Sequence, residues 1–324
     1  MSKKPKVGMW SGLTAVTAVL TAGAIVGTTV AFHYTTTVNN YLDADTYKII
    51  KGDSDEDTEY FKSDFTSDEE RESYEAELCA QVEAEGAALL KNDNSALPLA
   101  SGAKVSLFGH GSVDLMYGGT GSGSVDTSKA PNFKQALEDQ GIQVNSTLWD
   151  LYSSDDMMKN YSRITPAAIS DTLEANTQYA VNEAPWSKLS SAESSFADYG
   201  DAAIVVFSRS GGEGADLPSG ENGTNDSWIK GQEGDGNYLA LSTEEKELLQ
   251  NLKTLKDNGT FKKIIVLINS SNAIEMDFLN PEICGEDYGI DSAMWIGDVG
   301  QTGINGVAQL LAGEVTPSGS LVDS

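Results

Sequence analysis

Short apolar runs alternate with helical segments along most of the chain, and this alternation restricts the fold more than any other feature. The runs that read as buried strands are residues 104–108, 142–144, 202–207, 264–268 and 293–296. The helical candidates between them are residues 133–140, 243–255 and 302–311. The second of these opens with an N-cap sequence that begins at Ser242. Strands that alternate with helices predict a mostly parallel sheet flanked by helices, an α/β sandwich.

Two further segments complete the expected outline. From Ser67 the pattern is helical, with apolar residues at steps of four and seven that predict one apolar face: Tyr74, Leu78, Val82 and Leu89. On this reading Lys91 and Asn92 end the helix before the first strand and have an architectural role. The connection 146–200 is long and polar, so we expect helices and an exposed insertion there.

Composition excludes several classes of function. The 324 residues are 40% hydrophobic, enough for one sizeable core, and the formal charge of -28 leaves no basic surface for nucleic acid. The two cysteines, Cys79 and Cys284, form no disulfide framework, and we expect both to be buried, reduced thiols. The two histidines are far apart in sequence, and no cluster has metal-ligand spacing. We therefore expect no metal and no cofactor.

The N-terminus predicts a membrane segment. Lys3, Lys4 and Lys6 precede an uncharged stretch, residues 7–32, that as a helix is long enough to cross a hydrocarbon core of ~30 Å. Lysines on this side place residues 1–6 in the cytoplasm and the remainder outside. A cleaved signal peptide is the alternative to a signal anchor, and we favour the anchor. The expected protein is membrane-anchored, on the extracytoplasmic face of a bacterial-type cell.

An acidic spacer follows, over residues 33–72. Residues 41–80 hold fourteen acidic and four basic side chains, which is typical of a solvated spacer. A calcium loop of the EF-hand type beginning at Asp53 would need Gly at its sixth position and Glu at its twelfth. Those positions are Thr58 and Asp64, so the match fails.

The first candidate for chemistry is Glu213. It lies in a glycine-rich stretch, Ser210-Gly211-Gly212-Glu213-Gly214, directly after the apolar run 202–207. A strand that ends in such a loop presents its polar side chains at the carboxyl edge of the sheet, where open α/β sheets bind ligands. Asp216 is expected to order the loop, and the stretch 231–239 is expected to be structural.

A second glycine-rich loop, residues 117–125, follows the first strand. Taken alone it invites a phosphate-binding interpretation, but it lacks the Lys-Ser/Thr ending of a P-loop and is offset from the dinucleotide fingerprint. His110, in the lead to this loop, is interpreted as a packing or turn histidine. Three tryptophans, Trp186, Trp228 and Trp295, are candidates for sugar platforms. Only Trp228 lies in a long polar loop, and Trp295 is expected in the core.

Four motifs together closely resemble the α/β sandwich domain of glycoside hydrolase family 3, which includes β-glucosidases. They are Glu85-Gly86-Ala87-Ala88-Leu89-Leu90-Lys91-Asn92 with Leu97-Pro98-Leu99, the loop 117–125, the Glu213 loop, and Thr316-Pro317-Ser318-Gly319-Ser320-Leu321. The resemblance covers residues 75–324. It implies that Glu213 is the acid/base of a retaining mechanism, and that Ser122, with Thr120 and Gly121, contacts the sugar at the cleavage point. The implied ligands are β-linked glucosides or short oligosaccharides.

The resemblance also defines what is missing from the family pattern. The family's nucleophilic Asp lies on a (β/α)8 barrel, and the order here resembles the minority group in which the sandwich comes first. The chain stops at Ser324, where the pattern continues toward its next domain, so we expect a truncated gene or fragment, inactive by itself. Leu217 replaces the family's arginine after Asp216. The expected domain is residues 73–324, incomplete at its C-terminus. The alternative is a catalytically silent carbohydrate-binding or interaction module of the same fold.

Overall fold

The computed structural model describes residues 7–42, 61–165, 179–213, 217 and 237–322. It divides into two compact units, Met1–Asp64 and Phe65–Ser324.

The described part of the N-terminal unit is mainly helical. It contains α1 (Val7–His33) and α2 (Thr35–Tyr41). The segment Trp10–His33 is long and apolar enough to cross a membrane, a test that an N-terminal signal sequence also passes. Its threonines leave few unpaired hydroxyls, since Thr14, Thr17, Thr28 and Thr29 each donate to the carbonyl oxygen four residues earlier, at 2.8 or 2.9 Å. Self-satisfied hydroxyls lower the cost of placing these residues in hydrocarbon.

The second unit is built on a six-stranded sheet in the order β1-β6-β5-β4-β2-β3. Its strands are β1 (Ala88–Asn92), β2 (Lys104–Phe108), β3 (Gln143–Val144), β4 (Ala202–Arg209), β5 (Ile264–Ser270) and β6 (Ser292–Trp295). All pairs among β2 to β6 are parallel, which confirms the predicted α/β class, and β1 alone pairs antiparallel, with β6. The prediction that Leu89, Lys91 and Asn92 belong to a helix is wrong, because they lie in β1.

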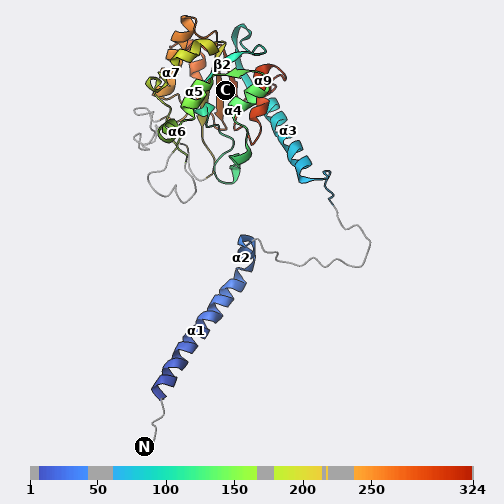
Figure 1. Cartoon of the computed structure of the whole chain (residues 1–324), viewed down its shortest axis with the longest axis vertical. Coiled ribbons are helices and arrows are strands. Elements are labelled where there is room, and N and C mark those ends of the chain that lie inside the picture. Colours follow the sequence, from blue (N-terminus) through green and yellow to red (C-terminus); the bar gives the residue numbers. More distant parts are fainter. Residues whose placement is uncertain (1–6, 43–60, 166–178, 214–216, 218–236, 323–324) are drawn as a thin grey trace, which may run out of the picture. The chain divides into compact units, whose positions relative to one another are not determined.

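Helices cover both faces of the sheet (Figure 1). One face carries α3 (Asp68–Gly86), α4 (Phe133–Asp139) and α9 (Ile304–Ala312). The other carries α5 (Ser146–Tyr152), α6 (Asp155–Tyr161), α7 (Thr243–Asp257) and two 3-10 helices, η6 (Trp186–Leu189) and η7 (Glu193–Tyr199). A short α8 (Pro281–Cys284) precedes β6. The described residues also form the 3-10 turns η1 (Asp93–Ser95), η2 (His110–Ser112), η3 (Gly121–Gly123), η4 (Thr127–Lys129) and η10 (Asp277–Leu279).

The central strand β4 shows why the sheet is covered twice. Every one of its residues is buried. Ile204 and Val206 face the α3–α9 side, whereas Val205 and Phe207 face the α7 side, as the two-residue period of a strand requires. A strand that is buried on both faces reads as a continuous apolar run, which is the pattern found at residues 202–207.

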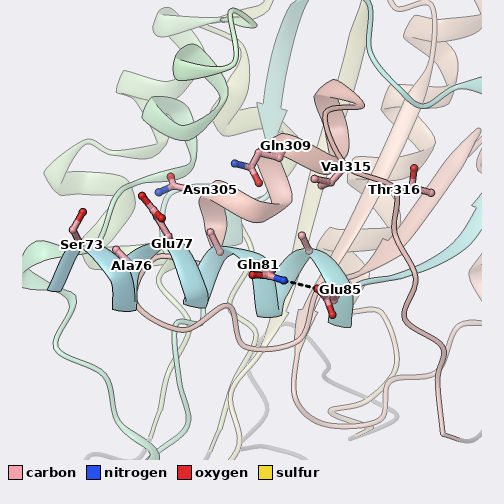
Figure 2. Close-up of a pocket in the computed structure, with 11 residues that line it drawn as sticks. Ser73, Ala76, Glu77, Gln81, Glu85, Asn305, Gln309, Val315 and Thr316 are labelled. Carbon is pink, nitrogen blue, oxygen red and sulfur yellow. Dashed lines mark hydrogen bonds between the residues drawn. The ribbon is translucent and has the colours of Figure 1, made fainter. Parts of the chain in front are cut away.

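Helix α3 packs through a different face from the one predicted. Its buried residues are Ala80 and Ala84, while Tyr74, Leu78 and Val82 are 52%, 42% and 63% exposed. Small residues form the buried face because α3 and α9 approach closely. A Cβ on Gly306 would lie 2.1 Å from the carbonyl oxygen of Ala80. Figure 2 shows the groove of about 580 Å³ along this contact, lined by Gln81 and Glu85 of α3 and by Asn305 and Gln309 of α9.

The cysteines depart in part from the prediction. Cys79 and Cys284 are both free thiols, as expected, but each is half-buried instead of fully buried. Cys79 lies on α3 next to the β6–α9 loop, with its Sγ 3.9 Å from the carbonyl oxygen of Val299.

Candidate functional site

The site lies where the loops after β2 and β4 meet at the carboxyl edge of the sheet. The backbone N–H of Thr120 donates to the carbonyl oxygen of Gly211 at 3.1 Å, and Thr120 forms an isolated parallel bridge with Gly212. The Thr120 hydroxyl donates to the carbonyl oxygen of Glu213 at 2.7 Å. These contacts extend the pairing of two neighbouring strands into their loops.

Glu213 and Ser122 contact each other directly. The backbone N–H of Ser122 donates to Glu213 Oε2 at 3.0 Å. This N–H, followed by the Ser122 side chain, lowers the pKa of Glu213, whose carboxylate is exposed to solvent. In this domain Glu213 is therefore an ionised, accessible carboxylate with a backbone donor on one oxygen.

Two glycines make this approach of the loops possible. Gly121 has φ +69°, and a Cβ there would lie 2.5 Å from Glu213 Oε2. Gly212 has φ +140°, and a Cβ there would lie 2.4 Å from the backbone nitrogen of Thr120. An L side chain at either position would meet both a backbone penalty and a steric clash.

The Glu213 loop rests on a buried ion pair. Arg209, the last residue of β4, is fully buried and bonds Glu245 through Nη1 to Oε1 at 2.8 Å and Nη2 to Oε2 at 2.7 Å. Its Nε donates to the carbonyl oxygen of Tyr238 at 2.7 Å, and Nη2 also donates to that of Ala240 at 2.8 Å. Burial alone would lower the pKa of Arg209, but the Glu245 carboxylate outweighs it and the pKa is raised.

Tyr238 completes this support from the same side. Its hydroxyl accepts from the backbone N–H of Ser210 at 2.8 Å and donates to the Ser210 carbonyl oxygen at 3.2 Å. Burial raises the pKa of Tyr238 to about 12, so the hydroxyl stays protonated. The backbone just before Glu213 is thus fixed by a fully buried side chain from a distant part of the sequence.

Sequence reasoning missed the role of Arg209. The signal was present, because an arginine at the end of a buried strand requires a buried partner. Glu245 was visible only as part of the N-cap of α7, and it does complete the capping box: its Oε2 accepts from the backbone N–H of Ser242 at 2.8 Å. One carboxylate therefore caps a helix and neutralises the arginine.

The structure brings together Thr120, Gly121, Ser122 and Glu213, the predicted site residues. Other candidates lie elsewhere. His110 is buried in a 3-10 turn, with Nε2 3.4 Å from Asp114 Oδ2, which suits a packing histidine. Asn92 has the architectural role predicted for it, since its side-chain amide exchanges hydrogen bonds with the backbone of Leu97 at 2.8 and 3.0 Å.

The remaining candidates are the tryptophans and the acidic residues near Glu213. Trp186 stacks on Phe108 with ring centroids 6.3 Å apart, so it serves the core. Trp295 is half-buried and lines a hollow of about 530 Å³ with Asn272 and Met276, so it is less buried than expected. Leu217 packs against Tyr179 and Tyr238. Asp216 and Trp228 lie outside the described residues, as do two further carboxylates of the sequence after Asp216, Glu221 and Glu233. Among the residues that are described, no group of three or more His, Cys, Asp or Glu is placed to hold a metal.

Comparison with known proteins gives consistent matches over the second unit. The family description "Glycosyl hydrolase family 3 C-terminal domain" matches residues 87–324. A β-glucosidase of Ruminococcus albus is 31% identical over 251 residues, which are 76% of this chain and 22% of that protein. β-Glucosidase A of Butyrivibrio fibrisolvens is 30% identical over 261 residues, 76% of this chain and 28% of that protein.

Solved structures agree with these matches. A β-glucosidase from Paenibacillus barengoltzii superposes with a TM-score of 0.55 at 28% identity, over 75% of this chain and 23% of that one. β-Glucosidase 3B from Thermotoga neapolitana, solved in complex with glucose, gives a TM-score of 0.56 at 25% identity, over 78% of this chain and 31% of that one. The chain thus spans about a quarter of the length of the curated relatives that it matches.

Proposed function

The chain belongs to glycoside hydrolase family 3, whose C-terminal domain it contains, and we propose that this domain supplies Glu213 as the acid/base residue of a retaining β-glucosidase. The observation that carries the proposal is the contact between Glu213 and Ser122, an exposed carboxylate and a backbone donor from two separate loops at one sheet edge. Relatives named as β-glucosidases support the reaction class.

The mechanism needs a second carboxylate. Retaining hydrolysis uses two carboxyl groups about 5–5.5 Å apart, one as the nucleophile and one that acts first as acid and then as base. We propose that the nucleophile is an Asp on a (β/α)8 barrel, so that the pocket forms between two domains. Glu213 would then protonate the glycosidic oxygen as the bond to the leaving group breaks, and later take a proton from the water that attacks the glycosyl-enzyme.

The lowered pKa of Glu213 fits this scheme only if the second domain changes it. Here the carboxylate is exposed and accepts the Ser122 N–H, so its anionic form is favoured. A barrel and a bound sugar would remove water from the carboxyl and bring a second negative charge near it, and both effects raise a pKa. Ser122 and Thr120 would contribute hydroxyls, which both donate to and accept from sugar hydroxyls.

The second candidate function is a catalytically silent carbohydrate-binding module, which the exposed Glu213 carboxylate would also suit. An ionised, solvent-exposed Glu213 can accept from sugar hydroxyls without any proton transfer. The two functions differ in one respect: only the enzyme requires Glu213 for turnover of substrates with poor leaving groups.

The test compares single variants in a polypeptide that carries this domain together with a barrel. Glu213→Ala should lose activity on disaccharides far more than on activated aryl β-glucosides, because a proton donor matters most for a poor leaving group. Azide should restore its rate and give a glycosyl azide, since azide attacks without needing a base. Glu221→Ala and Glu233→Ala are the matched controls, from the sequence that follows Glu213. Intact disaccharide turnover in Glu213→Ala, or azide rescue of a control instead, would refute the assignment.

We further propose that α1 anchors the protein with the sandwich outside the cytoplasm. The apolar span Trp10–His33 and the lysines before it support this orientation. Membrane fractionation followed by protease treatment of intact cells tests it, with the expected result that the domain is membrane-bound and degraded. N-terminal sequencing of the mature protein distinguishes an anchor from a cleaved signal peptide.

A further inference from the structure

Two short segments lie against the bases of both site loops, and we call them the strap: residues 163–165 and 179–183. They pair with each other through Ile164 and Ala180, whose backbones exchange two hydrogen bonds at 2.9 and 3.0 Å. Apart from Ile164, the strap is buried or half-buried. None of its residues belongs to the predicted site, but they contact the loop after β2 and the end of β4 that leads into the Glu213 loop.

Arg163 is the central contact of the strap. Its guanidinium donates to the carbonyl oxygens of Asp114 and Leu115 and, through Nη2, to Asp114 Oδ1 at 3.1 Å. Its Nη1 also donates to Ser208 Oγ at 3.0 Å. Asp114 and Leu115 lead into the loop that carries Ser122, and Ser208 lies in β4, five residues before Glu213. One planar side chain, only 10% exposed, thus joins the bases of both loops.

Three other strap residues reach the same two loops. The Thr165 hydroxyl lies 2.6 Å from Ser210 Oγ, and Ser210 is three residues before Glu213. The Tyr179 hydroxyl lies 3.5 Å from Thr120 Oγ1. The carboxylate of Glu183 accepts the backbone N–H of His110 at 2.7 Å, at the start of the β2 loop. The strap therefore contacts the β2 loop at several points, and on the other side it contacts Ser208 in β4 and Ser210 in the Glu213 loop.

The Arg163 contacts depend on the shape of the guanidinium. Arginine presents several donors in a fixed plane, so it can bond two carbonyl oxygens, a carboxylate and a hydroxyl at once. Lysine has a single nitrogen on a flexible chain and cannot span the same set of acceptors. The charge is compensated as well: Asp114 pairs with Arg163, and the pKa of Asp114 is lowered because His110 and Arg163 outweigh its burial.

We propose that Arg163 is a positioning residue, which fixes the β2 loop against β4 and so sets the approach of Ser122 to Glu213. The strap residue Thr165 acts in the same direction from the Glu213 side. Arg163 contacts neither of the two residues itself, so its effect passes through the loop backbones. The geometric part of the inference stands on the contacts alone, and its catalytic consequence rests on the proposed function of Glu213.

The geometric part is tested on the full chain in detergent, by NMR with labelled Glu carboxyls and backbone amides. In Arg163→Met the Ser122 N–H should exchange with solvent roughly threefold to tenfold faster, as expected for the loss of one hydrogen bond. The Glu213 pKa should rise toward its ordinary value, since the Ser122 donor that lowers it has moved away. In Arg163→Lys, both the Ser122 N–H exchange rate and the Glu213 pKa should lie between those of Arg163→Met and the wild type.

Two further variants separate positioning from general destabilisation. Thr165→Val removes one strap contact without removing a charge and should shift the Glu213 pKa in the same direction, by less. Arg71→Met removes an exposed arginine of α3 that pairs with Glu75, and it should leave Glu213 and Ser122 unchanged. If Arg163→Met folds and both readouts match the wild type, the proposal is wrong; if it does not fold, Arg163→Lys and Thr165→Val decide the question by the same readouts.

The catalytic consequence is measured in the polypeptide with a barrel. Arg163→Met should lower kcat on disaccharides about tenfold or more while KM changes little, because small displacements of a catalytic group act mainly on the transition state. An equal loss through KM alone would contradict positioning. If the NMR readouts change but Glu213→Ala keeps its disaccharide activity, the proposed function fails while the role of Arg163 in loop geometry stands.

Discussion

Buried charge is handled in opposite ways in two regions of this domain. Beneath the Glu213 loop, all three guanidinium nitrogens of Arg209 donate hydrogen bonds, and the Glu245 carboxylate neutralises its charge. Where Glu83 of α3 meets Asp298 of the β6–α9 loop, both groups are acids, and in the part of the chain that is described no donor reaches Glu83 Oε1 or Asp298 Oδ1. The first region holds a neutral pair, and the second holds two groups of the same sign.

The difference shows in how each region titrates. Burial, and then the nearby charge of Asp298, raises the pKa of Glu83 to about 8. Burial also raises the pKa of Asp298, against hydrogen bonds from Ser271 that lower it. The stability of the α3 region therefore depends on the protonation of Glu83 and Asp298, whereas the pKa of Arg209 is raised and its cation stays charged. In the proposed function the geometry of the Glu213 loop has to persist through proton transfer, and its support by a compensated ion pair suits that role.

The largest expected effect comes from breaking the compensated pair. Glu245→Gln leaves Arg209 buried and charged without its counterion, which should lower the free energy of unfolding by about 3–5 kcal/mol. Urea denaturation measures it. The matched control is Glu75→Gln, which breaks the exposed pair with Arg71 and should change stability little. Equal effects of the two changes would mean that the buried pair gives no special support.

The next effect is a pH dependence from the uncompensated region. The folded-state pKa of Glu83 is about 8, above its ordinary value of 4.5. Its favourable contribution is therefore fully present below pH 4.5 and is lost as the pH rises through about 8, because the folded state must then bury a charge. Glu83→Gln should gain on the order of 3 kcal/mol over the wild type at pH 9 and almost nothing at pH 4.5. A gain that is the same at both pH values would overturn this account.

A smaller loss should follow from a change in packing beside the same acids. In Gly306→Ala the new methyl group meets the carbonyl oxygen of Ala80, so α9 must move away from α3. Overpacking of this kind costs about 1–3 kcal/mol. Thermal denaturation at low pH, where Glu83 is protonated, isolates the packing contribution. An unchanged Tm would show that the α3–α9 contact is looser than the backbone positions imply.

The smallest effect is expected on the outer side of α3. Val82 is 63% exposed, so Val82→Ser should change the free energy of unfolding by no more than about 0.5 kcal/mol. Its matched partner is Ala84→Ser, which puts a hydroxyl at a position that is 5% exposed and should cost more. If Val82→Ser is the more damaging of the two, the apolar face of α3 predicted from the sequence is covered in solution.

The sequence predicted the parallel strands because they are buried on both faces, so that each reads as a continuous apolar run. It also predicted that Glu213 lies at the carboxyl edge, since strand polarity determines that. β1 was missed because residues 88–92 become a strand only through contact with β6, about 200 residues later. The face of α3 was misassigned because Ala80 and Ala84 carry too little apolar surface to stand out beside Tyr74 and Val82.

The strap contacts and the Arg209–Glu245 pair could not be predicted from the sequence for a similar reason. Arg163 and Ser208 are 45 residues apart, and Arg209 and Glu245 are 36 apart. Nothing in their local patterns pairs them. Periodicity reports which side of an element is buried, but it carries no information about which distant polar group will satisfy a buried charge.

The antiparallel edge strand has a mechanical consequence. α3 ends at Gly86 and β1 begins at Ala88, so tension on the chain before α3 enters the sheet through β1. β1 has a single neighbour, β6, whereas β4, which leads to Glu213, lies three places further into the sheet. Under load the β1–β6 ladder and the α3–α9 contact would yield first. Yielding there would leave β4, the strand that leads to Glu213, in place within the sheet.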